Sequence, residues 1–98
     1  MVKKLVENTE EVLYLKADTN YTIYSLKGGG KLVSGFILKI HQERCEYNHF
    51  IRINRSYLLN PKYIKEVIEV GSEKMVKLID GTLAKVSRRR MHVLSQLA

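Results

Sequence analysis

Short apolar runs separated by turn-forming residues dominate the hydrophobic pattern of this chain. Such a pattern is typical of a mostly-β protein, because a strand needs only about four to eight residues and a helix needs a longer apolar stripe. We predict strands in segments 12–15, 21–26, 31–34, 49–53, 57–59, 64–70, 75–79 and 82–86. Between the last two, Asp80–Gly81 is the pair that two-residue type I′ turns prefer, which predicts a tight hairpin.

Two segments depart from this pattern and predict short helices. Residues 36–46 contain no glycine or proline and suit a helix in the middle of the chain. Near the C-terminus, Ser87 is a favourable N-cap, and Met91, Leu94 and Leu97 follow it at helical spacing. We therefore expect one mid-chain helix and one C-terminal helix among the strands.

The chain length of 98 residues indicates a single domain spanning 1–98, with residues 1–10 as a short lead-in. No apolar run reaches the roughly 18 residues of a membrane span, so we expect no contact with the membrane interior. The first lysines have no long apolar stretch behind them, unlike a signal peptide. The single cysteine, Cys45, allows no disulfide within the chain, and together these features predict a cytoplasmic protein.

Metal and catalytic sites are not expected. His41, Cys45 and His49 are spaced by four and would share a face of a continuous helix with Glu46 nearby, but a strand is predicted to begin directly after His49. Gly28–Gly30 is not followed by the Lys-Ser/Thr pair of a phosphate loop, and no nucleophile or zinc-protease motif is present. The sequence thus predicts no enzyme activity, no cofactor and no small-molecule substrate.

The positive charge of the chain is concentrated in its second half. Residues 1–51 hold seven Lys/Arg against six Asp/Glu, whereas residues 52–98 hold ten against four. Five of the six arginines also lie in the second half, and the planar guanidinium group suits phosphates and guanine edges. This distribution favours a polyanionic partner.

Three consecutive arginines, Arg88, Arg89 and Arg90, follow the expected helix cap Ser87 directly. Cations at a helix start oppose the helix dipole by roughly 0.3–1 kcal/mol each, so folding alone does not favour this run. A bound anion would reverse the sign, because backbone amides and guanidinium groups would converge on it. The alternatives are a solvated basic turn or pairing with carboxylates of another strand, namely Glu66, Glu69 or Glu73.

Three stretches together resemble the LytTR family of bacterial transcriptional regulators. They are EVLYLKADTNYT (11–22), FIRINRSYLLN (50–60) and DGTLAKVSRRR (80–90), in the family's order and at its separations. The resemblance implies an elongated domain of about ten short strands in three small sheets, with a mid-chain helix and a C-terminal helix. It also implies a response-regulator output domain that inserts loops into successive major grooves of promoter DNA, as a pair on direct repeats.

The resemblance assigns base contacts to Asn20, with Tyr21 as its neighbouring substitute, and to Arg55 and Arg89. It assigns contacts with the DNA backbone to Arg52, Ser56, Lys62, Lys85, Ser87, Arg88 and Arg90. The chemistry agrees, because arginine can donate two bonds to guanine and asparagine can bind adenine through two bonds. Asn20 also fits ordinary turn chemistry, since asparagine tolerates left-handed backbone conformations.

Two other functions remain open at this stage. A single-stranded nucleic-acid binder could stack bases on the six tyrosines, at positions 14, 21, 24, 47, 57 and 63. An interaction module could instead dock its basic face onto an acidic protein or an anionic membrane surface.

Overall fold

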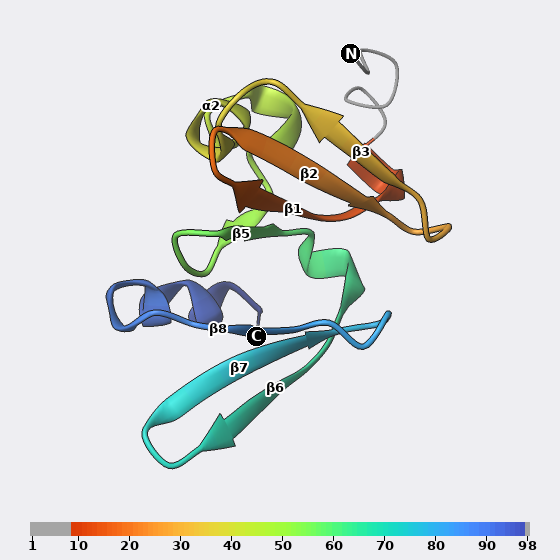
Figure 1. Cartoon of the computed structure of the whole chain (residues 1–98). Coiled ribbons are helices and arrows are strands. Elements are labelled where there is room, and N and C mark those ends of the chain that lie inside the picture. The colour runs from red at the N-terminus through yellow and green to blue at the C-terminus, as the bar shows by residue number, and fades with distance from the viewer. Residues whose placement is uncertain (1–8, 98) are drawn as a thin grey trace.

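Two antiparallel sheets, stacked along the long axis of the molecule, contain the strands of residues 9–97, which the computed structural model describes (Figure 1). The five-stranded sheet has the order β3-β2-β1-β5-β4, and the three-stranded sheet has the order β6-β7-β8. The strands are β1 (Val12–Asp18), β2 (Tyr21–Leu26), β3 (Lys31–Ser34), β4 (Ile51–Arg52), β5 (Tyr57–Leu59), β6 (Ile64–Val70), β7 (Glu73–Leu78) and β8 (Leu83–Lys85). The body measures 41 × 24 × 22 Å, so the mostly-β class and the elongated shape are both confirmed.

Strand β1 lies at the centre of the larger sheet and faces a core on each side. It pairs with β2 on one edge and with β5 on the other. A bulge between Val12 and Tyr14 shifts the register, so Leu13 and Tyr14 both face the core between the sheets, whereas Val12 and Leu15 face the other core. A strand that is covered on both faces needs an unbroken apolar run, which explains the sequence of this segment.

The two cores differ in position and in composition. The core between the sheets contains Leu13, Tyr14, Ile51, Ile53, Leu59, Tyr63, Val76, Leu78, Ala84 and Val86. The core on the other face of the larger sheet, beneath helix α2, contains Val12, Leu15, Tyr24, Leu38, Tyr47, Phe50 and Leu58. The larger sheet is therefore packed on both faces and forms a firm support for the turns at its ends.

The helices are short, and most of them follow the 3₁₀ pattern. They are η1 (Thr9–Glu11), α2 (Leu38–Gln42), η2 (Cys45–Tyr47), η3 (Pro61–Tyr63) and η4 (Arg88–Leu97). The helix predicted over residues 36–46 is present as α2 and η2, separated by extended backbone at Arg44. The predicted C-terminal helix is η4, where the three-residue spacing of Met91 and Leu94 suits a 3₁₀ helix and places both against the core between the sheets. No helix in residues 9–97 is long and apolar enough to cross a bilayer.

One finer expectation differs from the structure. Residues 9–97 form eight strands in two sheets rather than about ten in three, because β5 pairs with β1 and so joins the β4–β5 pair to the larger sheet. Most of the predicted lead-in, residues 1–8, lies outside the described residues.

The turn between β7 and β8 is not the type I′ turn that Asp80–Gly81 predicts. Gly81 has a positive φ of 93°, but Asp80 does not, and a type I′ turn requires both. The Gly81 amide donates to the Leu78 carbonyl oxygen (3.0 Å), and the Leu78 amide donates to the Thr82 carbonyl oxygen (2.9 Å). This is a three-residue hairpin with Gly81 as its left-handed bulge residue. The Asp80 carboxylate favours it by accepting a hydrogen bond from the Thr82 amide (3.0 Å).

Candidate nucleic-acid interface

Three turns that are far apart in the sequence lie beside one another along one edge of the molecule, on the left of Figure 1. The Ala17 amide donates to the Ser56 carbonyl oxygen (2.8 Å), which joins the end of β1 to the β4–β5 loop. The Ser87 amide donates to the Ile53 carbonyl oxygen (2.9 Å), which joins the β4–β5 loop to the segment between β8 and η4. We call this surface, which comprises residues 18–21, 53–56 and 86–90, the loop edge. It brings together Asn20, Tyr21, Arg55, Ser56, Ser87, Arg88, Arg89 and Arg90.

The first turn of the loop edge has a strained backbone. Thr19 and Asn20 connect β1 to β2. Among the non-glycine residues of positions 9–97, only Thr19 has a positive φ, at +56°. The β6–β7 turn also spans two residues, and there Gly71 holds the corresponding position with φ at +62°. A β-branched residue is disfavoured in this region, so Thr19 stores strain beside the exposed Asn20. Turn chemistry suggested a left-handed backbone at Asn20, but the residue with the positive φ is its neighbour Thr19.

Replacing Thr19 with glycine should raise the free energy of unfolding by about 1 kcal/mol. The strain of about 1–2 kcal/mol exceeds the additional chain entropy that glycine loses on folding. Urea or thermal unfolding measures the difference. The matched control is Asn20→Gly, which relieves no strain and should lower the stability. A Thr19→Gly protein that is no more stable than the wild type would contradict the strained conformation.

The β4–β5 loop presents Arg55 to solvent and is closed by side chains of its own segment. The Asn54 Oδ1 atom accepts hydrogen bonds from the amides of Ser56 (2.7 Å) and Tyr57 (2.9 Å). Arg52 donates through Nε to the Asn54 carbonyl oxygen (2.8 Å) and through Nη2 to the Arg55 carbonyl oxygen (2.7 Å). The Arg55 side chain forms no hydrogen bond or ion pair within residues 9–97, so its guanidinium group can bind a ligand.

Arg52 is tied to the protein more closely than a phosphate-contacting residue would be. Besides its two bonds to loop carbonyls, it donates through Nη1 to the Gln42 Oε1 atom of α2 (2.5 Å). Burial, and next the positive charge of Arg90, lower the pKa of the Arg52 guanidinium, although an arginine stays protonated. Two of the three Arg52 hydrogen bonds thus go to the β4–β5 loop, whereas the resemblance grouped this residue with the DNA-backbone contacts.

The third segment of the loop edge carries the arginine run. Ser87 directly precedes η4, and the Arg90 amide donates to its carbonyl oxygen (3.0 Å). Arg88 and Arg89 are exposed, and Arg90 is partly exposed. None of the three forms an ion pair within residues 9–97. Three guanidinium groups without an ion pair in the described residues are therefore available to an anionic partner.

The carboxylates considered as partners of these arginines, Glu66, Glu69 and Glu73, form no ion pair with them in the described residues. Glu69 pairs with Lys74 (3.7 Å), and Glu73 pairs with Lys85 (2.8 Å). The hydrogen bond and the charge of Lys85, and at a greater distance Arg88, lower the pKa of Glu73. Lys85 is thus partly compensated, and it contributes less free positive charge to the loop edge than the arginines do.

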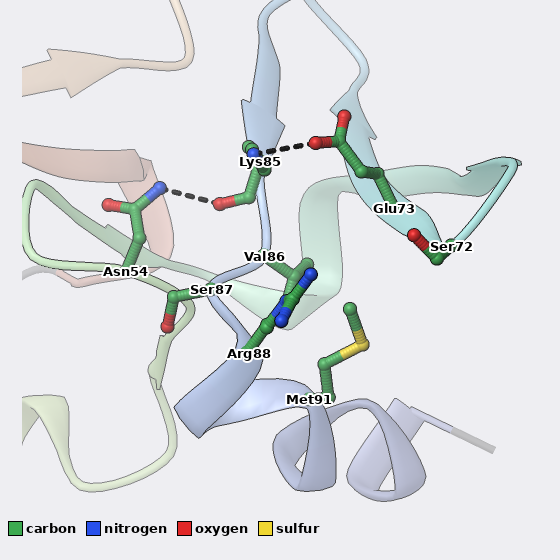
Figure 2. Close-up of a pocket in the computed structure, with 8 residues that line it drawn as sticks. All are labelled: Asn54, Ser72, Glu73, Lys85, Val86, Ser87, Arg88 and Met91. Carbon is green, nitrogen blue, oxygen red and sulfur yellow. Dashed lines mark hydrogen bonds and ion pairs between the residues drawn. The ribbon is translucent and has the colours of Figure 1, made fainter.

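A hollow of about 450 Å³ lies beside the start of η4. It is lined by Asn54, Ser72, Glu73, Lys85, Val86, Ser87, Arg88 and Met91. Figure 2 shows Arg88 reaching from η4 toward this space, with the Lys85–Glu73 pair on its far side. The Asn54 Nδ2 atom donates to the Lys85 carbonyl oxygen (2.7 Å) across the same region. The hollow is lined by charges of both signs, and it borders the loop edge at Asn54, Ser87 and Arg88.

Lys62 is the predicted contact that lies away from the loop edge. It belongs to η3, which follows the far end of β5, and its ammonium group pairs with the Glu10 carboxylate. That pairing, through a hydrogen bond and charge, raises the pKa of Lys62. The sequence places Lys62 only a few residues after Arg55, but β5 carries the chain to the opposite end of the sheet.

The histidines and the cysteine near α2 do not form a metal site. His41 is buried, with Nδ1 3.1 Å from the Tyr24 hydroxyl and Nε2 2.9 Å from the Ser34 hydroxyl. Cys45 is exposed beyond the end of α2. No group of three potential metal ligands comes together in the part of the chain that the structure describes.

Sequence reasoning missed two residues that shape the loop edge, Asn54 and Gln42. In the sequence, Asn54 lies between two predicted strands, where an asparagine can close a turn by accepting a hydrogen bond from the amide two residues later. Gln42 is ten residues before Arg52, and nothing in the local pattern indicates that the two side chains meet.

Comparisons with known proteins agree with this description. The sequence matches the family of LytTr DNA-binding domains over residues 3–98. The structure is similar to that of the LytTr DNA-binding domain of a putative methyl-accepting/DNA response regulator from Bacillus cereus, with a TM-score of 0.77 and 21% sequence identity. The similarity covers 90% of this chain and 81% of that chain. No curated protein sequence matches the chain.

Proposed function

This chain belongs to the family of LytTr DNA-binding domains, and we propose that it is a regulator of transcription that reads double-stranded DNA through the loop edge. Asn20, Arg55 and Arg89 read base edges, with Tyr21 beside Asn20. Ser56, Ser87, Arg88 and Arg90 hold the phosphates, and Lys85 adds a weaker contact. Phosphate contacts fix the register of a protein on a duplex, and base contacts supply the sequence preference.

One observation carries the proposal: three turns joined by backbone hydrogen bonds place four arginines without internal ion pairs on a single edge. By contrast, Lys62 at the other end of the larger sheet pairs with Glu10, and Lys85 beside the loop edge pairs with Glu73. Unpaired guanidinium groups on one surface repel one another, so a polyanion is the partner that such a surface favours.

The shape of the molecule supports contact with more than one groove. Its long axis of 41 Å exceeds the roughly 34 Å of one turn of B-DNA, and the turns of the loop edge follow one another along that axis in Figure 1. We therefore expect successive major grooves to be contacted from one face of the duplex. Two copies would bind a direct repeat side by side, and each would repeat the same contacts.

Stacking on unpaired bases has less support. Tyr14, Tyr24, Tyr47 and Tyr63 are buried in the cores, and Tyr57 is partly buried. Tyr21 is the tyrosine that the loop edge exposes, at 55% of its surface. A single-stranded binder needs several exposed rings in a row. Among the tyrosine and phenylalanine side chains of residues 9–97, only Tyr21 and Phe36, at 43%, are exposed.

Selection of bound sequences from a pool of random duplexes tests the proposal. We expect a defined site, and a repeated site if two copies bind together. Competition with single-stranded oligonucleotides of the same sequence should leave the duplex bound. Preference for the single strand, or binding to neither nucleic acid, would instead favour the single-stranded or the acidic-partner function.

Removing Arg55 or Arg89 should relax the base preference rather than abolish binding. Each guanidinium can form two hydrogen bonds with a guanine, so Arg55→Ala and Arg89→Ala should each lower discrimination by about 1–2 kcal/mol at one position of the site. Repeating the selection with each variant measures this. Lys31→Ala removes one charge at the start of β3, away from the loop edge, and should change nothing. Unchanged preference in both arginine variants would contradict the assigned base contacts.

A further inference from the structure

We infer that Arg52 and Asn54 are positioning residues, which lock the Arg55 loop and the arginine segment of η4 into one rigid reading unit. The inference rests on the proposed function, because it concerns how that function obtains its sequence preference. Neither side chain needs to touch DNA for this role. We call the pair the Arg52–Asn54 clamp.

The Arg52 half of the clamp fixes the β4–β5 loop from the side of α2. Its three hydrogen bonds, at 2.5–2.8 Å, use all three guanidinium nitrogens, and their acceptors are Gln42, Asn54 and Arg55. Two of the acceptors are backbone carbonyls of the loop itself, which sets the direction of the peptide units on either side of Arg55. A planar guanidinium can hold several acceptors in one geometry, and a lysine ammonium on a flexible stem cannot.

The Asn54 half joins that loop to the next one. Its Oδ1 atom accepts from the amides of Ser56 and Tyr57 within the loop, and its Nδ2 atom donates across to the Lys85 carbonyl oxygen (2.7 Å). The Ser87 amide returns a bond to the Ile53 carbonyl oxygen (2.9 Å). These two bonds, in opposite directions, hold the backbone on either side of Val86, directly before η4 begins at Arg88, so Arg55 and Arg89 cannot shift independently.

The geometry explains how reading can be shared between two loops. An exposed arginine samples many rotamers, and its base contact is productive only if the backbone beneath it is fixed. The clamp fixes both backbones relative to each other, so placing one arginine on its base also places the other. The measurable consequence is a loss of preference at two base positions when one bridge is removed.

The experiment first uses Arg52→Lys, which separates the positioning role from a phosphate contact. Lysine is itself a good phosphate binder, so a phosphate-contacting residue would tolerate the change with little loss of affinity for any duplex. The clamp predicts about tenfold weaker binding to the selected site and less than twofold change for a random duplex. Affinity for both duplexes that stays within twofold of the wild type would overturn the role of Arg52.

The second variant, Asn54→Ser, breaks only the bridge between the loops. A serine hydroxyl can still accept from the amides that follow it, but it is too short to reach the Lys85 carbonyl oxygen. We expect preference to relax at the positions read by Arg55 and by Arg89 together, and affinity for the selected site to fall about tenfold. Asn48→Ser, at an exposed asparagine after η2, is the matched control and should behave as the wild type.

Binding to a random duplex, measured for each variant, reports whether the folded basic surface is intact. If the wild type selects no site, the proposed function fails and the clamp fails with it. If the wild type selects a site and both variants keep its full preference, the clamp alone is wrong. If Asn54→Ser relaxes one position only, the two loops read independently, which also overturns the inference.

Discussion

The affinity of this domain for its duplex should fall about fortyfold when the salt concentration rises from 50 to 200 mM. The cations assigned to phosphates are Arg88, Arg90 and the weaker Lys85, and each phosphate that such a group neutralises releases counterions. About three neutralised phosphates give a slope of roughly −2.7 in a plot of log affinity against log salt for each bound copy. Fluorescence anisotropy with a labelled duplex measures this slope.

The variants of this experiment test the location of the charges. Arg88→Gln should reduce the slope by about one and weaken all duplexes alike, because Arg88 is assigned to a phosphate. Lys62→Gln should leave the slope unchanged, because Lys62 pairs with Glu10 at the other end of the larger sheet. A slope near zero, or an equal effect of both variants, would show that the loop edge does not contact the phosphates.

The protein should lose about 2 kcal/mol of stability between pH 7 and pH 5 because of His41. Burial, and then the positive charge of Arg44, lower the pKa of His41 to about 4, against about 6.5 in an unfolded chain. As the pH falls below about 6.5, the unfolded chain takes up the proton first, so the free energy of unfolding decreases until about pH 4. Urea unfolding at several pH values measures this dependence.

The pH dependence is assigned to His41 by comparing slopes rather than absolute stabilities. His41→Gln also removes hydrogen bonds to Tyr24 and Ser34, so it should be less stable than the wild type at pH 7, with a much flatter dependence below it. His49→Gln, at an exposed histidine, should retain the wild-type dependence. The same slope in all three proteins would mean that His41 is not the group responsible.

The strands could be predicted from the sequence, because their signal is local. Segment 12–15 carries the apolar residues that a covered strand needs, and segment 64–70 carries the β-branched residues that favour a strand although β6 is largely exposed. Each predicted segment contains part of an observed strand. The helix over 36–46 was predicted as one element because no glycine or proline interrupts it. The observed break at Arg44 brings Tyr47 into the core beneath α2, which is a tertiary requirement.

The candidate site could be predicted only in part. The sequence indicated the residues of the loop edge through a resemblance and through the arginine run, but it could not indicate which cations are engaged elsewhere. Lys62 and Arg52 illustrate the difficulty, because their partners, Glu10 and Gln42, are distant in the sequence. The conformation of Thr19 was also hidden, since turn statistics favour asparagine or glycine at such a position.

The central claim is that three turns from distant parts of the chain contact one duplex together. Amide chemical shifts of the labelled domain, recorded during titration with the selected duplex, test it most directly. We predict that the largest changes fall in all three segments, residues 18–21, 53–56 and 86–90. Changes confined to one of these segments, or centred on residues 28–31 and 60–62 at the other end of the larger sheet, would contradict the account.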